Sequence, residues 1–491
     1  MAQESLADHL RRATRNFTTR FPEDRVFALG HALALDLARA HGEQPPRHPE
    51  IDPALVEMVD GAPRLTTGTA VGDVAEDLFR LGCLLSALAL GEPAALSWRL
   101  DGPPPVEAST VRRRAVLATL AAPRRIDRHA SALDAARELQ AASGPMASAG
   151  GWPLFRGDAG RSGWRPLAAA ARVRVLWRAA VGPVAASPVL TPDLVLVPAA
   201  DGRLLFIDRE RGRLLHVVPL GPSESSPALS GGVLHVGTDD GTLVGIDVQT
   251  GAERYRARLG GLVRSSPLPV GDRVLVGVVD AKGGGALAAV DARGKTAWAR
   301  KTGAVFSSPA LGGGRVVCGS DDGALTAVDP ATGALAWSAA LGAKVRATPA
   351  VAGELAVVGT FDGLVKAVRL ADGTVAWSAP LGHAVYSSAC IAGAQVVVGC
   401  HEGHLHGLDL ATGRASFETA TGGPVVSSPV AAGPVVLAPS TDGRLYLLDA
   451  SGAVLSRELV APGGIQSSPA LDGADVALGS AEGVHLLRVE P

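Results

Sequence analysis

The chain has 491 residues, of which 60 are glycine and only 4% are aromatic, and its formal net charge is −2. This length exceeds that of one ordinary domain and suffices for two or three. A charge so close to zero excludes the strong electrostatic attraction typical of proteins that bind nucleic acid or anionic membranes. Many glycines with small aliphatic residues are typical of sheets built from short strands and tight turns.

The cysteine spacing and the apolar runs indicate a cellular compartment. Four cysteines without paired spacing favour a reducing environment over a disulfide framework. The first residues lack the apolar core of a secretion signal. The longest apolar run, LGCLLSALAL at 81–90, is far shorter than the roughly 20 residues of a membrane span. We therefore expect a cytoplasmic monomer that contacts neither membrane nor nucleic acid.

Residues 1–141 are predicted to form a smaller, all-α domain. Val26, Leu29, Leu33 and Leu37 recur at three- and four-residue steps, which places one apolar stripe on a helix. A nearly all-apolar segment at 77–91 is typical of a buried helix. The Gly- and Ser-rich stretch at 142–151 is predicted to be a linker.

The order of segments in this domain resembles the helical lobe of bacterial serine/threonine protein kinases. HPEIDPALVEMVDG at 48–61 stands where that family has its catalytic loop, and DLFRLGCLLSALALGEP and RIDRHASALDAARELQ resemble later helices. The resemblance places the family's catalytic Asp on Glu50, its loop Lys on Asp52 and its metal-binding Asn on Leu55. Phosphoryl transfer depends on those groups. The resemblance thus implies a catalytically dead, pseudokinase-like lobe, with an unrelated helical domain as the alternative.

A repeat organises the rest of the chain. The third residue of SSP, or of a close variant, recurs every 39 to 42 residues, at Pro188, Pro227, Pro267, Pro309, Pro349, Ala389, Pro429 and Pro469. Each unit has the pattern of four short strands, with an acidic-Gly turn between the second and third. The sequence therefore predicts an all-β, eight-bladed propeller over 152–491 with four-stranded antiparallel blades. The extra strand VRVLWRAAVG at 173–182 is expected to complete the last blade.

The repeat contains a family signature. AVDPATGALAW at 327–337 resembles the A-x-D-x-x-T-G-x-x-x-W pattern of pyrroloquinoline-quinone-like (PQQ-like) propellers, and GWPLFRGDAGRSGWRP at 151–166 resembles their lead-in segment. We expect the Asp and Thr to form the turn and the aromatic residue to pack between blades. Family members that hold the quinone have an adjacent cysteine pair and acidic metal ligands on long insertions. Neither feature occurs in this sequence, so the resemblance implies no cofactor.

One variable position in each repeat is the candidate binding site. The residue two before the last Ser or Thr of the SSP motif is expected at one mouth of the central channel. Around the ring, this position is occupied by Ala185, Glu224, Arg264, Phe306, Arg346, Tyr386, Val426 and Gln466. Blades three to six thus place Arg, Phe, Arg and Tyr side by side, which suits an anionic or aromatic group. A solvated funnel without a ligand is the alternative.

A second cluster and the overall function complete the sequence-based expectations. His404 and His406 share one face of a strand and are a weak metal candidate, but no metal site is expected because these positions vary among repeats. We expect a non-catalytic interaction protein whose propeller binds a protein partner or a small anionic or aromatic ligand. A ligand-sensing regulatory protein is the alternative, and a quinoprotein oxidoreductase is the least favoured reading.

Overall fold

The computed structural model describes residues 56–59, 62–65, 151–167 and 170–491, and the chain divides into two units, Met1–Met146 and Ala147–Pro491. In the first unit, β1 (Val56–Val59) pairs antiparallel with β2 (Ala62–Leu65). The all-α prediction for this unit is therefore not supported. It overlooked the Asp-Gly at 60–61, which is a sequence signal for a hairpin. The kinase-like positions Glu50, Asp52 and Leu55 and the predicted helices lie outside the described residues.

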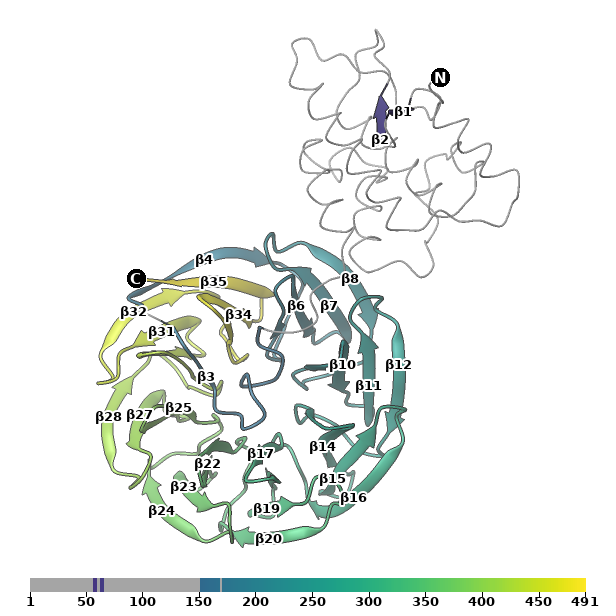
Figure 1. Ribbon diagram of the computed structural model, residues 1–491. Helices are drawn as coiled ribbons and strands as arrows, with labels where there is room; N and C mark the ends of the chain where they lie inside the picture. The colour runs from purple at the N-terminus through teal and green to yellow at the C-terminus, as the bar shows by residue number, and fades with distance from the viewer. Residues whose placement is uncertain (1–55, 60–61, 66–150, 168–169) are drawn as a thin grey trace. The chain divides into compact units, whose positions relative to one another are not determined.

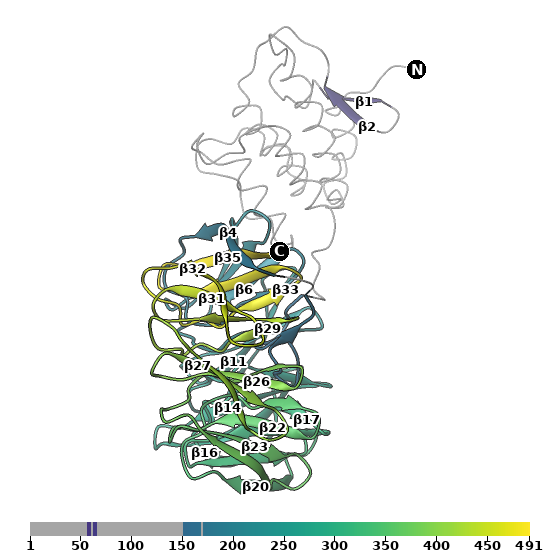
Figure 2. The ribbon, with the colours of Figure 1, turned by 90° about the vertical axis from the view of Figure 1, so that its left-hand side faces the viewer.

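The second unit confirms the eight-bladed propeller. Its strands form eight antiparallel sheets arranged around a ring, which is a flat disc when seen from its edge (Figures 1 and 2). Four consecutive strands build each of blades 1 to 7, and blade 8 combines both ends of the unit. Among the residues that the structure describes, no helix has the length and apolar character needed to cross a membrane.

The strand bounds, from the innermost to the outermost strand of each blade, are as follows: blade 1, β5 Val189–Leu190, β6 Leu194–Pro198, β7 Arg203–Asp208, β8 Leu214–Pro219; blade 2, β9 Ala228–Ser230, β10 Val233–Gly237, β11 Thr242–Asp247, β12 Glu253–Arg258; blade 3, β13 Leu268–Val270, β14 Arg273–Val279, β15 Gly284–Asp291, β16 Thr296–Gly303; blade 4, β17 Ala310–Gly312, β18 Arg315–Gly319, β19 Ala324–Val328, β20 Leu335–Ala340. The remaining blades are blade 5, β21 Ala350–Ala352, β22 Leu355–Gly359, β23 Leu364–Arg369, β24 Val375–Pro380; blade 6, β25 Cys390–Ala392, β26 Gln395–Gly399, β27 His404–Asp409, β28 Ala415–Ala420; blade 7, β29 Val430–Ala432, β30 Val435–Pro439, β31 Arg444–Leu448, β32 Val454–Leu459; blade 8, β33 Ala470–Asp472, β34 Asp475–Gly479, β35 Val484–Glu490, β4 Arg172–Ala179.

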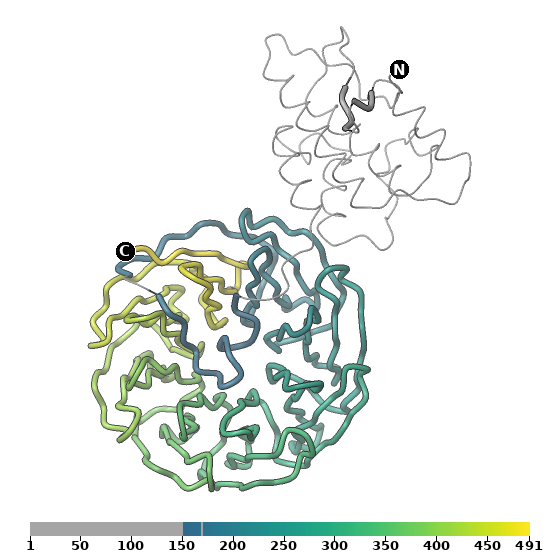
Figure 3. Tube along the Cα trace, viewed as in Figure 1, coloured from purple at the N-terminus to yellow at the C-terminus, as the bar shows by residue number. Residues whose placement is uncertain are grey.

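The ring closes in blade 8, where the beginning of the propeller meets its end. The extra strand is β4, Arg172–Ala179, and it pairs antiparallel with β35 so that Val173 faces Val489. Figure 3 shows these two segments running side by side near the C-terminus. The outer strand of the last blade thus comes from residues more than 300 positions earlier in the chain. This pairing covers an edge of β35 that would otherwise be open to other strands.

The SSP motif forms a ring of hydrogen bonds that ties the blades together. The last Ser or Thr of each motif is buried, and at seven of the eight blade interfaces its side-chain oxygen accepts a hydrogen bond from the backbone N–H of the equivalent residue in the preceding blade. The contact recurs from Ser388 to Ser428 and from Ser428 to Ser468, each at 2.9 Å. The bond from Ser468 to Ser187, also 2.9 Å, joins blade 8 to blade 1. The recurrence of the motif is therefore explained by this hydrogen bond between neighbouring blades.

The signature aromatic residue packs against a glycine of the following blade. The ring of Trp337 lies on Gly373, where an added Cβ would come within 2.7 Å of the ring. Its indole N–H donates a hydrogen bond to the carbonyl of Leu370 at 2.8 Å. In the signature turn of blade 4 itself, the Asp329 carboxylate accepts hydrogen bonds from the backbone N–H and hydroxyl of Thr332, both at 2.8 Å. The turn and packing roles expected for the signature are therefore observed.

The lead-in segment fills the channel as a plug, which we define as residues 152–165. Figures 1 and 3 show this dark blue segment crossing the centre of the ring. Its backbone carbonyls accept hydrogen bonds from N–H groups of the innermost strands, for example Ala159 from Leu311 at 2.7 Å and Gly160 from Val351 at 2.8 Å. At its end, β3 (Trp164–Arg165) adds a parallel strand to β29 in blade 7. The plug thus joins blades that are distant in sequence.

Two buried arginines anchor the plug. The Arg161 guanidinium donates to the carbonyls of Pro309 and Pro267, at 3.1 and 2.8 Å, and Arg156 donates to the carbonyl of Pro429 at 2.5 Å. Burial lowers the pKa of Arg161 to about 9 and that of Arg156 to about 10. Both residues also have positive φ angles, 57° and 66°, which is uncommon outside glycine. The surrounding carbonyls hold them in this conformation.

The contact between blades predicts different costs for two glycine substitutions. Gly373 and Gly382 have φ angles of +79° and +83°, so an alanine at either site adopts an unfavourable backbone conformation, at roughly 1–2 kcal/mol. Only at Gly373 does the new Cβ also collide with Trp337. We expect Gly373→Ala to lower the thermal midpoint clearly more than Gly382→Ala, which has nothing within 4 Å. Equal thermal midpoints of the two variants would show that the contact between Trp337 and Gly373 does not contribute to stability.

The anchored plug predicts a large effect of a buried arginine. Arg161→Met leaves the carbonyls of Pro309 and Pro267 buried without a donor, and we expect a loss of roughly 3–5 kcal/mol in the free energy of unfolding. Arg174→Met is the control, because that exposed side chain pairs with Glu490 at 2.8 Å and contributes about 0–1 kcal/mol. Denaturant unfolding of both variants measures the difference. A similar small loss in both would mean that the plug does not contribute to stability.

Two buried histidines predict acid sensitivity. Burial lowers the pKa of both His235 and His485 to about 4, from 6.5 in an unfolded chain. The unfolded state therefore gains these protons first as pH falls, so the free energy of unfolding decreases below about pH 6.5. Thermal midpoints measured from about pH 6.5 to about pH 5 are expected to fall, and to fall less steeply in His235→Gln. An identical slope in that variant would exclude His235 as a cause.

Candidate functional site

The variable position of the SSP repeat forms an accessible ring at one mouth of the channel. In each blade this residue is exposed or half-buried, while the residues on either side of it are buried. The plug bonds to residues that follow this position, such as Pro309 and Leu311 after Phe306. The plug therefore lies deeper in the channel than the ring. Of the predicted residues, Glu224, Tyr386 and Gln466 are exposed, and Arg264, Phe306 and Arg346 are half-buried.

A second ring of residues lies at the same mouth of the channel. It was not predicted from the sequence. It consists of the residue just before each acidic-Gly turn, and its members include Asp239, Asp321, Phe361 and His401. The backbone N–H of each bonds to a carbonyl of the loop that carries the first ring, for example Asp321 to Ala304 at 2.9 Å. The sequence did contain a signal for this second ring. The residue before the acidic-Gly turn varies in type between repeats, as the residues of the first ring do.

Blades 4 to 6 join the two rings into an aromatic row, which we define as Phe306, Arg346, Phe361, Tyr386 and His401. The Arg346 guanidinium lies 4.2 Å from the ring centre of Phe306 and 5.4 Å from that of Phe361. The Phe361 and Tyr386 rings are tilted by 48° with their centres 4.4 Å apart, and the His401 ring lies 5.5 Å from that of Tyr386 at a tilt of 44°. Such contacts contribute about 0.5–1.5 kcal/mol each. The structure thus brings together three of the predicted residues and two that were not predicted.

Carboxylates hold both arginines of the mouth. Arg346 donates through Nε and Nη2 to Asp321, at 2.9 and 2.7 Å, and Lys344 lies 3.8 Å from the same carboxylate. Arg264 binds Asp239 in the same way and contacts Glu224 at 3.1 Å. These hydrogen bonds hold the pKa of Arg264 and Arg346 above the usual value, so both remain charged.

The local charge differs between the two arginines. Around Asp321, two cationic side chains share one carboxylate, whereas around Arg264 two carboxylates share one cation. Among these ion-paired groups, the cations outnumber the carboxylates around Asp321 and the carboxylates outnumber the cations around Arg264. The first residue of the run predicted in blades three to six, Arg264, pairs with Asp239 and Glu224 and is not part of the aromatic row. Gln466 belongs to blade 8 and lies across the ring from the row.

The predicted histidine pair lies elsewhere. His404 and His406 are on β27 in blade 6 and line a groove between blades 5 and 6. Among the described residues, no three His, Cys, Asp or Glu side chains stand close enough to share a metal ion. Burial lowers the pKa of His406.

Solved structures of other propellers resemble this fold. The chain aligns with BamB from Moraxella catarrhalis at 18% identity and a TM-score of 0.54, covering 66% of this chain and 99% of that one. It aligns with quinohemoprotein alcohol dehydrogenase from Comamonas testosteroni at 15% identity and a TM-score of 0.60, covering 70% and 81%. A europium-containing methanol dehydrogenase aligns at 14% identity and a TM-score of 0.58, covering 67% and 89%. At these identities the likeness establishes the fold. No curated protein matches the sequence.

These comparisons correct the function expected from the sequence. The expected class was a non-catalytic interaction protein with a dead kinase-like lobe. The similar structures instead include two dehydrogenases beside an assembly factor, and together with the family match below they favour a propeller of the PQQ type. The expected function class was inferred from missing loop insertions, whereas a shared propeller ring does not by itself carry a function.

The repeats also match a family model, described as outer membrane protein assembly factor BamB, over residues 218–310 and 283–490. Together these matches cover more than half of the chain, including all of blades 2 to 7 and three strands of blade 8. The N-terminal kinase-like resemblance has no such support. The chain therefore belongs to this family of PQQ-like β-propellers.

Proposed function

We propose that the propeller binds a quinone cofactor of the pyrroloquinoline-quinone class at the channel mouth, against the aromatic row. The observation that carries the proposal is the row of contacting aromatic rings beside two cations, Arg346 and Lys344. The similar dehydrogenase structures support the choice of ligand class. When bound, such a quinone accepts two electrons from a substrate.

The residues at the mouth fit the chemistry of this group. The quinone is planar, aromatic and carries several carboxylates, so it requires stacking surfaces and cationic donors. Tyr386 is 41% exposed and offers its ring to a ligand, while Phe361 supports that ring from behind. Arg346 uses Nε and Nη2 for Asp321, which leaves the Nη1 edge of the guanidinium for a ligand carboxylate. Lys344 is half-exposed and adds a second cation.

The plug supports the proposal by closing the channel beneath the mouth. Its buried arginines and backbone bonds occupy the space between the innermost strands. The plug therefore limits access to the mouth from the interior of the channel. Burial on that side removes water from the ligand and strengthens its contacts with charged groups.

Calorimetric titration of the full chain with pyrroloquinoline quinone tests the proposal. We expect saturable one-to-one binding, weakened roughly tenfold by Tyr386→Val and by Arg346→Gln, since stacking and charged hydrogen bonds contribute about 1–3 kcal/mol each. Both replacements occur at the same position in other blades, as Val426 and Gln466, so the fold accepts them. Gln466→Ala, across the ring, is the control and is expected to bind normally.

Two results would contradict the proposal. Absence of binding by the unmodified chain would exclude this ligand class. Unchanged affinity in the Tyr386→Val, Arg346→Gln double variant would exclude the aromatic row as its site.

A further inference from the structure

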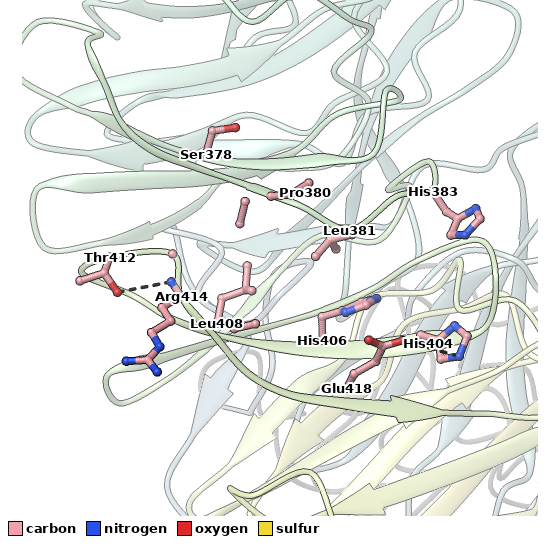
Figure 4. A pocket seen from close by; sticks show the side chains of 13 residues that line it. Ser378, Pro380, Leu381, His383, His404, His406, Leu408, Thr412, Arg414 and Glu418 are labelled. Carbon is pink, nitrogen blue, oxygen red and sulfur yellow. Dashed lines mark hydrogen bonds and ion pairs between the residues drawn. The ribbon is translucent and has the colours of Figure 1, made fainter.

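A groove on the outer part of the propeller is separate from the channel mouth. It has a volume of about 490 Å³ and lies between β24 of blade 5 and strands β27 and β28 of blade 6 (Figure 4). Its polar lining includes Ser378, His383, His404, His406 and Glu418. Imidazole and carboxylate groups are the ligands that zinc and related metals use in proteins.

The β-sheet register places three of these side chains on one face. His404 and His406 are two residues apart on β27, so their side chains point to the same side. Glu418 on β28 is the direct cross-strand partner of His406, which puts its side chain on that side as well. The two imidazole ring centres are 6.2 Å apart, and His404 Nε2 lies 3.8 Å from Glu418 Oε1. Figure 4 shows the three side chains facing the groove together.

His406 carries an unsatisfied nitrogen. The residue is only 8% exposed, and its Nε2 atom is buried without a hydrogen-bond partner in the structure. A buried polar atom without a partner costs about 1–3 kcal/mol, so such atoms call for an explanation. The fold does not require an imidazole here, because other blades have Val244, Thr326 and Tyr446 at the same position. The nitrogen lacks a protein partner, and the imidazole must turn toward the groove for it to reach a ligand.

We infer that His404, His406 and Glu418 form a binding site for a divalent transition metal of the zinc class. Three protein ligands leave a fourth position for water on the open side of the groove. Bonds of about 2.0 Å in tetrahedral geometry bring ligand atoms to roughly 3.3 Å from each other. The three side chains must therefore converge, since the described residues contain no preformed metal cluster. His404 and Glu418 are 36% and 60% exposed and are free to turn.

At the histidine end of the groove the carboxylate of Glu418 disfavours an anion, whereas Arg414 adds a positive charge to the lining. The Glu418 carboxylate would repel an anion but is a good ligand for a cation. His383, at the end of the groove, already pairs with Glu402 at 3.3 Å and is not counted as a ligand. It serves instead as a matched imidazole for a control.

Zinc titration of the full chain tests the inference, using protein without a polyhistidine tag and treated with chelator. We expect one Zn²⁺ per chain, with affinity reduced more than about 100-fold in the double variant His404→Ala, His406→Thr. Blade 4 has this pair at the same positions, as Ala324 and Thr326, so the variant is expected to fold. His383→Ala is expected to bind zinc like the unmodified chain. Glu418→Gln is expected to bind more weakly.

A Co²⁺ titration provides a spectroscopic readout of the ligands. We expect visible absorption bands of four-coordinate Co²⁺ in the unmodified chain and their loss in the double variant. In chelator, the thermal midpoint of the double variant is expected to equal or exceed that of the unmodified chain, because the unpartnered imidazole is gone. Absence of a one-to-one zinc complex, binding unaffected by the double variant, or binding of inorganic phosphate in place of metal would each overturn the inference.

Discussion

The hydrogen bond between the SSP motifs of neighbouring blades is the constraint on which the rest of this propeller depends. Each blade is a small sheet that cannot bury its faces alone, so it is stable only against its neighbours. The buried hydroxyl sets the distance and angle at which the next innermost strand begins. Because the bond from Ser468 to Ser187 closes the ring, the last blade obeys the same geometry as the others. The mouth, the channel and the grooves between blades follow from that spacing.

The packing of Trp337 on Gly373 also joins two neighbouring blades, but at the outer part of the ring. The glycine is required for two reasons at once, a positive φ in the turn and the close approach of the indole ring. The pattern recurs with Trp298 on Gly333 and Trp377 on Gly413. An inner hydrogen bond and an outer aromatic contact thus hold most neighbouring blades together, which leaves the remaining positions free to vary.

Both candidate sites use these free positions. The aromatic row is made of residues that flank the SSP motif and the acidic-Gly turn, and the groove residues replace Val, Thr or Tyr of other blades. A repeat architecture allows this because one blade can change its surface without altering the contacts that hold the ring. The two cations around Asp321 and the unpartnered nitrogen of His406 are therefore local features. The shared fold accounts for neither of them.

The sequence by itself determined the number of blades, their four-stranded pattern and the positions of the mouth ring, because a repeat of about 40 residues with fixed turn signals reflects local geometry. It also placed Phe306, Arg346 and Tyr386 in neighbouring blades. Tertiary structure alone decided that Phe361 and His401 join them, that Arg264 turns to Asp239, and that Glu418 faces His406. It also decided that residues 152–165 fill the channel, with Arg161 bonded to carbonyls more than 100 residues away. These contacts join residues that are distant in sequence. The groups that they involve are backbone carbonyls or variable side chains, and neither has a sequence motif that would reveal the contact.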